Sequence, residues 1–138
     1  VNLLVTDYFK RLREAAHHMD CAEELIKWFN NHSRALAMLK DEQRRRDPEG
    51  HVLALLYPAA TRWSSRYLTC TRLLELEASI RCLLITKLDE LVQFTPRGKN
   101  AEETARKQEK TREMLKYAMQ QPFWDNIRVY VPYSCEQI

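Results

Sequence analysis

The sequence predicts an all-α fold, an irregular multi-helix bundle of about five to six helices that forms a single domain over residues 1–138. Three observations lead to this prediction. The chain has only 2 glycines and 5 prolines, far fewer turn residues than a β-sandwich or barrel needs. Of its residues, 30% are charged, and the helix formers Leu, Ala, Glu, Lys and Arg are abundant. At 138 residues, it can bury a core without disulfides or metals.

The first third of the chain is expected to contain two helices. Apolar side chains recur at helical spacing over residues 4–19, with charged side chains on the other side, which indicates an amphipathic helix. Asp20 and Glu23 have the spacing of a capping box, so we expect one helix to end and the next to start at Asp20. The second helix runs toward Lys40 and is bent at residues 30–33, where polar side chains compete for backbone hydrogen bonds.

A turn is predicted after this second helix, at residues 47–50. Pro48 disfavours helical geometry at Asp47, and Gly50 relaxes the chain. The following segment, residues 51–58, is short, apolar and closed by a proline. We therefore expect it to be an extended or short helical connector.

The second half is expected to be helical, with one clear loop. The helical period is strong over residues 63–92, which predicts a central apolar helix or helix pair. A proline and a glycine within residues 95–99 predict the loop. Asn100 and Glu103 repeat the capping-box spacing before a very polar helix. In the last helix, Pro122 fits the first turn, and a second proline, at position 132, must end or kink it.

The composition excludes several classes of protein. The formal charge of +3 permits a nucleic-acid partner and does not demand one. No apolar run approaches the roughly 18 residues that span a bilayer, so no membrane partner is expected. No Cys-x-x-Cys pair and no signal-peptide pattern occur, and we expect reduced thiols in a nuclear or cytoplasmic protein. The cysteines are Cys21, Cys70, Cys82 and Cys135.

No catalytic or metal site is expected within the chain. His17 and Cys21 are one helical turn apart and, with His18, invite a metal interpretation. Too few ligands are visible, however, and we expect Asp20 to break the helix between them, so we predict no metal and no cofactor. The serines and histidines form no nucleophile and base pair by spacing, which leaves a hydrolase or another enzyme of a small-molecule substrate without support.

The segment from Ala60 to Tyr67, Ala-Thr-Arg-Trp-Ser-Ser-Arg-Tyr, followed by Thr-Arg-Leu-Leu-Glu-Leu over residues 71–76, resembles the Thr-Arg-Trp signature and Leu-rich helix of hAT-superfamily DNA transposases. Ser64 stands where that family more often has Asn. Val-Asn-Leu-Leu at residues 1–4 and Phe-Trp at residues 123–124 match flanking elements in the right order. The resemblance implies that the chain is the start of a transposase's helical insertion domain.

The same resemblance implies that the chain is not an enzyme by itself. In the family, a ribonuclease H-like core supplies the metal-binding carboxylates for strand cleavage, and those stretches lie outside the insertion domain. Asp7 does not match a catalytic position. The chain starts without Met, and we expect it to be part of a longer protein, itself a DNA transposase or derived from one.

Arg62 and Trp63 are the residues to which the resemblance assigns a role. The family's Trp stabilises a flipped base during hairpin formation, and an aromatic face with an adjacent cation suits that task. Arg66 in the same segment joins them as a candidate DNA contact. A second interpretation stays open, in which Trp63 is the first core residue of its helix. Trp28 and Trp124 are expected to be packing residues.

Two basic stretches are further candidates for DNA contact. The run Arg44, Arg45 and Arg46 ends a predicted helix, where it can either clamp a phosphate or complement the helix dipole. Flanking acidic residues favour the second interpretation. The polar helix after residue 100 alternates basic and acidic side chains, which indicates a solvated face.

Two functions are consistent with the sequence. In the first, the chain is a non-catalytic fragment of a hAT transposase-like protein that contributes DNA-end contacts and flipped-base stacking within the full-length parent. In the second, it is a helical protein-protein interaction module derived from a domesticated or truncated transposase. An exposed Trp63 beside a basic groove would support the first function. A buried Trp63 with an exposed apolar patch elsewhere would support the second.

Overall fold

The fold is all-α, as the sequence predicts. A computed structural model describes residues 2–57 and 63–135, apart from the side chains of some residues in the first, third and last helices. Six helices and no strand occur in this part of the chain. They are α1 (Asn2–Asn31), α2 (Ser33–Arg46), α3 (Trp63–Glu75), α4 (Glu77–Gln93), α5 (Ala101–Tyr117) and α6 (Gln121–Cys135).

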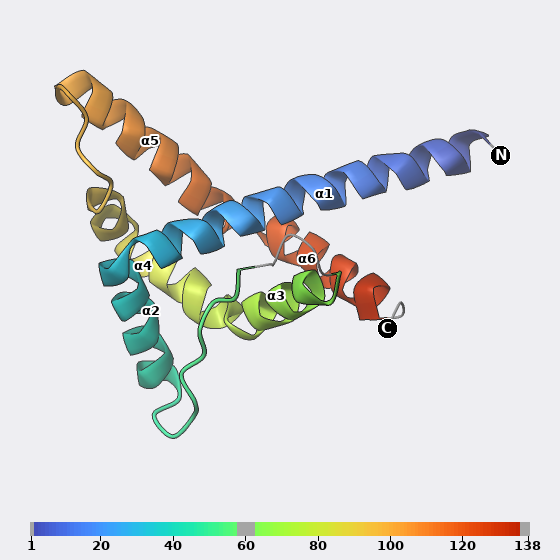
Figure 1. Cartoon of the computed structure of the whole chain (residues 1–138), viewed down its shortest axis with the longest axis horizontal. Helices are drawn as coiled ribbons and strands as arrows, with labels where there is room; N and C mark the ends of the chain where they lie inside the picture. Colours follow the sequence, from blue (N-terminus) through green and yellow to red (C-terminus); the bar gives the residue numbers. More distant parts are fainter. Residues whose placement is uncertain (1, 58–62, 136–138) are drawn as a thin grey trace.

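The helices pack around α1 and α4. α1 crosses the length of the molecule, and its N-terminal turns extend away from the other helices (Figure 1). α3 packs chiefly on α6, α2 on α4, and α1 on α6, while α5 lies against α4 and α1. No helix in the described part of the chain is long and apolar enough to cross a membrane.

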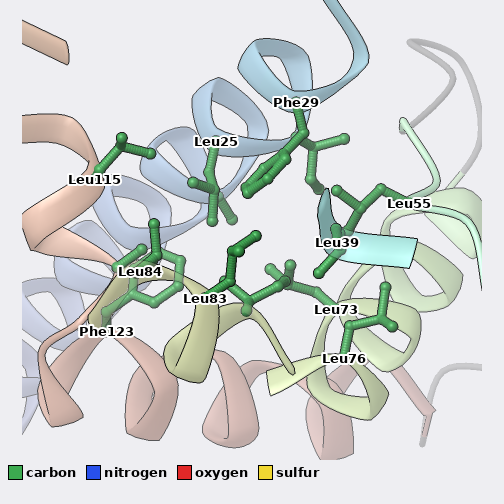
Figure 2. Close-up of a cluster of buried hydrophobic side chains, with 14 of the residues drawn as sticks. Leu25, Phe29, Leu39, Leu55, Leu73, Leu76, Leu83, Leu84, Leu115 and Phe123 are labelled. Atoms are coloured by element: carbon green, nitrogen blue, oxygen red, sulfur yellow. The ribbon is translucent and has the colours of Figure 1, made fainter. Parts of the chain in front are cut away.

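The core draws side chains from every helix and from the connector after α2. Figure 2 shows Leu25 and Phe29 of α1 facing Leu83 of α4, with further leucines of α2, α3 and the connector beside them. Trp124 of α6 is fully buried, and its Nε1 donates to the carbonyl of Ala118 at 2.7 Å. Both tryptophans expected to pack do so, since Trp28 lies against this core as well.

The expected break at Asp20 is wrong. α1 continues through Asp20, because the buried positions Met19, Ala22, Leu25 and Ile26 on both sides of it form one uninterrupted helical stripe. Asp20 itself is exposed. An exposed Asp inside a helix costs only about 0.7 kcal/mol relative to Ala. This cost is smaller than the stabilisation gained by burying the apolar stripe.

The break comes instead at His32, within the segment expected to bend. His32 has an extended backbone, with φ −123° and ψ 92°. Its Nδ1 donates to the carbonyl of Trp28 at 2.6 Å, and its ring stacks on the Trp28 indole at 4.6 Å between centroids. This side chain therefore satisfies a carbonyl at the end of α1 that would otherwise lack a partner.

Both turns predicted from proline and glycine are confirmed. α2 ends at Arg46, and the amide of Gly50 donates to the carbonyl of Asp47. Residues 51–57 form an extended connector, and residues 94–100 separate α4 from α5. The central apolar segment is a pair, α3 and α4, divided at Leu76, and α4 has non-helical angles at Lys87.

The predictions for the first turns of the last two helices are also confirmed. The Asn100 side chain accepts from the amide of Glu103 at 2.8 Å. Pro122 lies in the first turn of α6. The helix does not end at Pro132, since it continues to Cys135; a proline removes a single backbone donor, and the neighbouring turns still form.

Candidate nucleic-acid interface

The Thr-Arg-Trp segment lies at the entrance to α3. Trp63 is the first residue of that helix and Arg66 completes its first turn, although the side chains of both lie outside the described part of the structure. Arg62 lies outside the described residues altogether. The structure therefore gives the backbone setting of the motif, which is a helix N-terminus.

That setting is electropositive. The first turn of α3 contains no acidic residue. The unsatisfied backbone N–H groups of a helix N-terminus, together with the helix dipole, attract anions such as phosphate. An approaching phosphate would meet these donors without a competing carboxylate on the same turn.

The arginine run at the end of α2 divides into three different environments. Arg44 Nη1 pairs with Asp41 at 3.1 Å, and both side chains are exposed. Arg45 binds both carboxylate oxygens of Glu42, at 2.6 and 3.1 Å, and lies 3.6 Å from Cys82 Sγ on α4. Arg46 is exposed and makes no ion pair within the described residues.

The pair of Arg45 and Glu42 has a structural role. The guanidinium holds the pKa of the Glu42 carboxyl below its usual value, chiefly through the hydrogen bond between them. Glu42 in turn raises the pKa of Arg45. The contact with Cys82 joins α2 to α4, although the Arg45 side chain stays 63% exposed.

The structure does not bring the two sets of candidate residues together. The C-terminal end of α2 and the N-terminal end of α3 are well separated, with the connector between them (Figure 1). The connector is held to α2 by Gln43, whose Nε2 donates to the carbonyl of Leu53 at 3.0 Å and whose Oε1 accepts from its amide at 2.8 Å. The arginine run and the start of α3 are therefore at separate positions on the molecule (Figure 1).

A polar cluster lies at the crossing of α1 and α5, and the sequence indicated its α1 side chains but not Tyr117 of α5. His17 Nε2 and Cys21 Sγ of α1 are 3.8 Å apart. Tyr117 of α5 places its hydroxyl 2.5 Å from His18 Nδ1, and its ring stacks on the His18 ring at 5.6 Å between centroids. Because 99 residues separate His18 from Tyr117, no local pattern could have indicated this contact.

The electrostatics of the cluster favour neutral side chains. Burial lowers the pKa of His18, an effect that His17 strengthens and Glu14 opposes. Burial raises the pKa of the Cys21 thiol, and the charge of Glu24 raises it further. Burial also raises the pKa of Tyr117. A protonated thiol is a poor nucleophile, so the arrangement favours packing and hydrogen bonding over covalent chemistry.

The expectation of no metal site rested partly on a helix break at Asp20, and that break does not occur because α1 is continuous. His17 and Cys21 do share a helix face, since Asp20 does not interrupt the helix. Within the described residues, however, no group of three or more His, Cys, Asp or Glu side chains is arranged to hold a metal ion.

Comparison with known proteins finds no matching protein-family model, no matching curated protein and no matching solved structure.

Proposed function

We propose that this chain is a non-catalytic helical part of a hAT transposase-like protein and that it contributes DNA-end contacts to the full-length parent. Trp63 would stack on an unpaired base, and Arg62 and Arg66 would contact the adjacent phosphates. Strand cleavage would be carried out by the parent's own metal-binding carboxylates. In this proposal, the full-length protein acts on DNA in the nucleus.

The observation that supports the proposal best is the position of Trp63 at the first residue of α3. A base extruded from a duplex needs an aromatic face, and its flanking phosphate needs a cation or backbone N–H groups. The first turn of α3 combines the Trp, an Arg and the helix N-terminus, with no acidic side chain. These are the groups that base stacking and phosphate contact would need, which is the role that the Thr-Arg-Trp resemblance implies.

Substitution of Trp63 tests the proposal directly. Binding of the chain to a DNA hairpin with an unpaired base is compared with binding to a fully paired duplex of the same length. Trp63→Ala should weaken hairpin binding by roughly 5- to 150-fold, equivalent to about 1–3 kcal/mol of lost stacking. Duplex binding should stay nearly unchanged, because its affinity comes from phosphate contacts. The matched variant Trp63→Phe keeps an aromatic face and should retain most of the hairpin affinity.

Arg62→Ala provides the complementary test. It should weaken binding to both DNAs modestly and lower the salt dependence by about one phosphate contact. A core role for Trp63 predicts another pattern, since loss of a buried Trp costs about 3–5 kcal/mol of stability. A collapse of the melting temperature in Trp63→Ala, or hairpin binding at the wild-type level, would reject the stacking role. Metal-dependent DNA cleavage by the purified chain would reject the non-catalytic part.

A protein-protein interaction module is the second candidate function. It is favoured by two apolar side chains that flank residues 58–62 in the sequence, Tyr57 and Leu68, each 55% exposed. Contiguous exposed apolar patches are typical of surfaces that a partner covers, and these two side chains are candidates for such a patch. Replacing both with Ser, in a chain that keeps its melting temperature, should abolish association with such a partner and leave DNA binding intact.

A further inference from the structure

Among the six helices, α2 has the largest net positive charge. α2 has five basic and two acidic side chains over 14 residues, a net charge of +3, equal to the formal charge of the whole chain. The other 124 residues together are therefore formally neutral. No acidic residue occurs in the first turn of α2.

Three of these basic residues share one face. With about 100° per residue, Arg34, Lys40 and Arg44 fall within an arc of about 120°, spread over about 15 Å of helix. The buried positions of α2, Ala35, Leu39 and Gln43, point in the opposite direction. We call the surface of Arg34, Lys40 and Arg44 the α2 basic face.

This face is accessible and only partly neutralised. Arg34 and Lys40 are exposed and make no ion pair within the described residues. Asp41 is the acidic side chain on this side of α2, and it pairs with Arg44. The exposed residue between the cations is Ala37, whose small side chain would allow a partner's backbone to approach closely. α2 lies at an edge of the molecule (Figure 1).

We infer that the α2 basic face binds the phosphate backbone of duplex DNA, independently of base sequence. Exposed cations along one helix face can contact backbone phosphates without contacting the bases, and binding releases the counterions condensed on the duplex. The inference rests on the proposed function only in taking DNA as the partner. It concerns a different surface, because the start of α3 lies away from the end of α2 (Figure 1).

α5 offers a matched control surface. It is also an outer helix with exposed basic residues, but its five basic side chains are interleaved with four acidic ones, a net charge of +1. Arg106 and Lys110 are exposed and without an ion pair in the described structure. Replacing them removes the same two side-chain types as replacing Arg34 and Lys40, and it changes the net charge equally.

The experiment measures binding of the chain to a paired DNA duplex of arbitrary sequence at several salt concentrations. R34Q/K40Q should raise the dissociation constant roughly tenfold at low salt and lower the salt slope by about 2. The control R106Q/K110Q should change both quantities by much less. Melting temperatures of the two variants should equal that of the wild type, since all four residues are exposed.

Three results would overturn the inference. The first is that the wild-type chain does not bind the duplex at low salt. The second is that R34Q/K40Q and R106Q/K110Q lose duplex affinity equally. The third is that R34Q/K40Q loses affinity for an acidic polypeptide such as polyglutamate while its duplex affinity is unchanged. R34Q/K40Q should weaken hairpin and duplex binding alike, whereas Trp63→Ala should affect the hairpin alone. The two proposals can therefore fail separately. Rejection of base stacking by Trp63 would not reject duplex binding by the α2 basic face, and rejection of the α2 basic face would not reject base stacking.

Discussion

Two helices of equal length, α4 and α5, are stabilised in different ways. Each has 17 residues. α4 buries six side chains, among them Leu83, Leu84 and Val92, whereas within its own bounds α5 buries only Leu115. α4 thus depends on the core that surrounds it, as most helices in proteins do.

α5 is stabilised largely by its own sequence and by the loop before it. Asn100 caps its first turn, and the Glu103 carboxylate accepts from the amide of Lys99 at 2.8 Å. Thr104 Oγ1 accepts from the amide of Gly98 at 2.9 Å. Arg112 Nη1 pairs with Asp89 of α4 at 2.8 Å. Because the interactions of Gly98, Lys99 and Asn100 with the first turn are local and mostly exposed, the N-terminal end of α5 should open at a lower free energy than α4.

The largest expected effect is in α4. Leu84→Ala should lower the free energy of unfolding by about 2–5 kcal/mol, because it removes a fully buried side chain and leaves a cavity. The adjacent Ile85→Ala is the matched control, since Ile85 is 63% exposed and should cost less than about 0.5 kcal/mol. Urea denaturation of both variants measures the difference. Equal losses would mean that α4 is not anchored by its buried face.

The connector after α2 is the next most sensitive region. Gln43→Ala should cost about 1–3 kcal/mol, because it leaves the amide and carbonyl of Leu53 without their side-chain partner. Gln43→Glu keeps an acceptor for the Leu53 amide and loses the donor to its carbonyl, so its cost should be intermediate. Thermal denaturation ranks the three proteins. A neutral Gln43→Ala would show that Leu55 packing and the hydrogen bond from Arg72 Nη1 to the Ala54 carbonyl are sufficient to hold the connector.

The same contrast explains which parts of the fold could be predicted. The turns at 47–50 and 94–100 and the cap at Asn100 depend on neighbouring residues, so a local pattern was sufficient. The continuity of α1 through Asp20 depends on packing against other helices, and a capping-box spacing there was misleading. The irregularity within residues 30–33 was predicted from polar side chains that compete for backbone hydrogen bonds, but the sequence did not indicate that His32 would end the helix by bonding to the Trp28 carbonyl.

The candidate sites also differ in how much of each could be predicted from local sequence. The arginine run was visible as a sequence feature, but the different contacts of its members depend on the structure. Arg44 forms a surface pair, Arg45 contacts Glu42 and Cys82, and Arg46 makes no ion pair within the described residues. Arg34 and Lys40 are six positions apart, and they were not grouped with the run until the buried side of α2 was known. The contact of His18 with Tyr117 joins distant segments and had no sequence signal.

A smaller effect is expected at the start of α5. Asn100→Ala removes the cap and should cost about 1 kcal/mol, while Asn100→Asp retains an acceptor and should be close to neutral. Hydrogen exchange should be faster for the amides of Glu103 and its neighbours in the first turn, with the α4 amides unchanged. Acceleration spread equally over α4 and α5 would contradict the local character of α5.

The smallest expected effect concerns the crossing of α1 and α5, and it depends on pH. Tyr117→Phe removes the hydrogen bond to His18 and should cost about 0.5–1.5 kcal/mol near pH 7.5. His18 has a pKa below the ordinary value of 6.5, which favours the neutral ring, whose Nδ1 can accept from the phenol. Unfolded His18 binds a proton more readily than folded His18, so this stabilisation is complete above pH 6.5 and declines as the pH falls toward the folded pKa.

The wild-type protein should therefore lose stability between pH 7.5 and pH 5, and Tyr117→Phe should lose less over the same interval. Urea denaturation of both proteins at the two pH values tests this, with His17→Gln as a control for the neighbouring imidazole. His17 lies beside Cys21 and helps to lower the pKa of His18, so His17→Gln should bring the folded pKa of His18 closer to 6.5 and make the decline of stability smaller without abolishing it. An equal cost of Tyr117→Phe at both pH values would mean that Nδ1 carries the proton and Tyr117 is the acceptor. In that case the contact joins α1 to α5 at every pH in this range, because a protonated Nδ1 donates to the phenol oxygen whether the ring is neutral or charged.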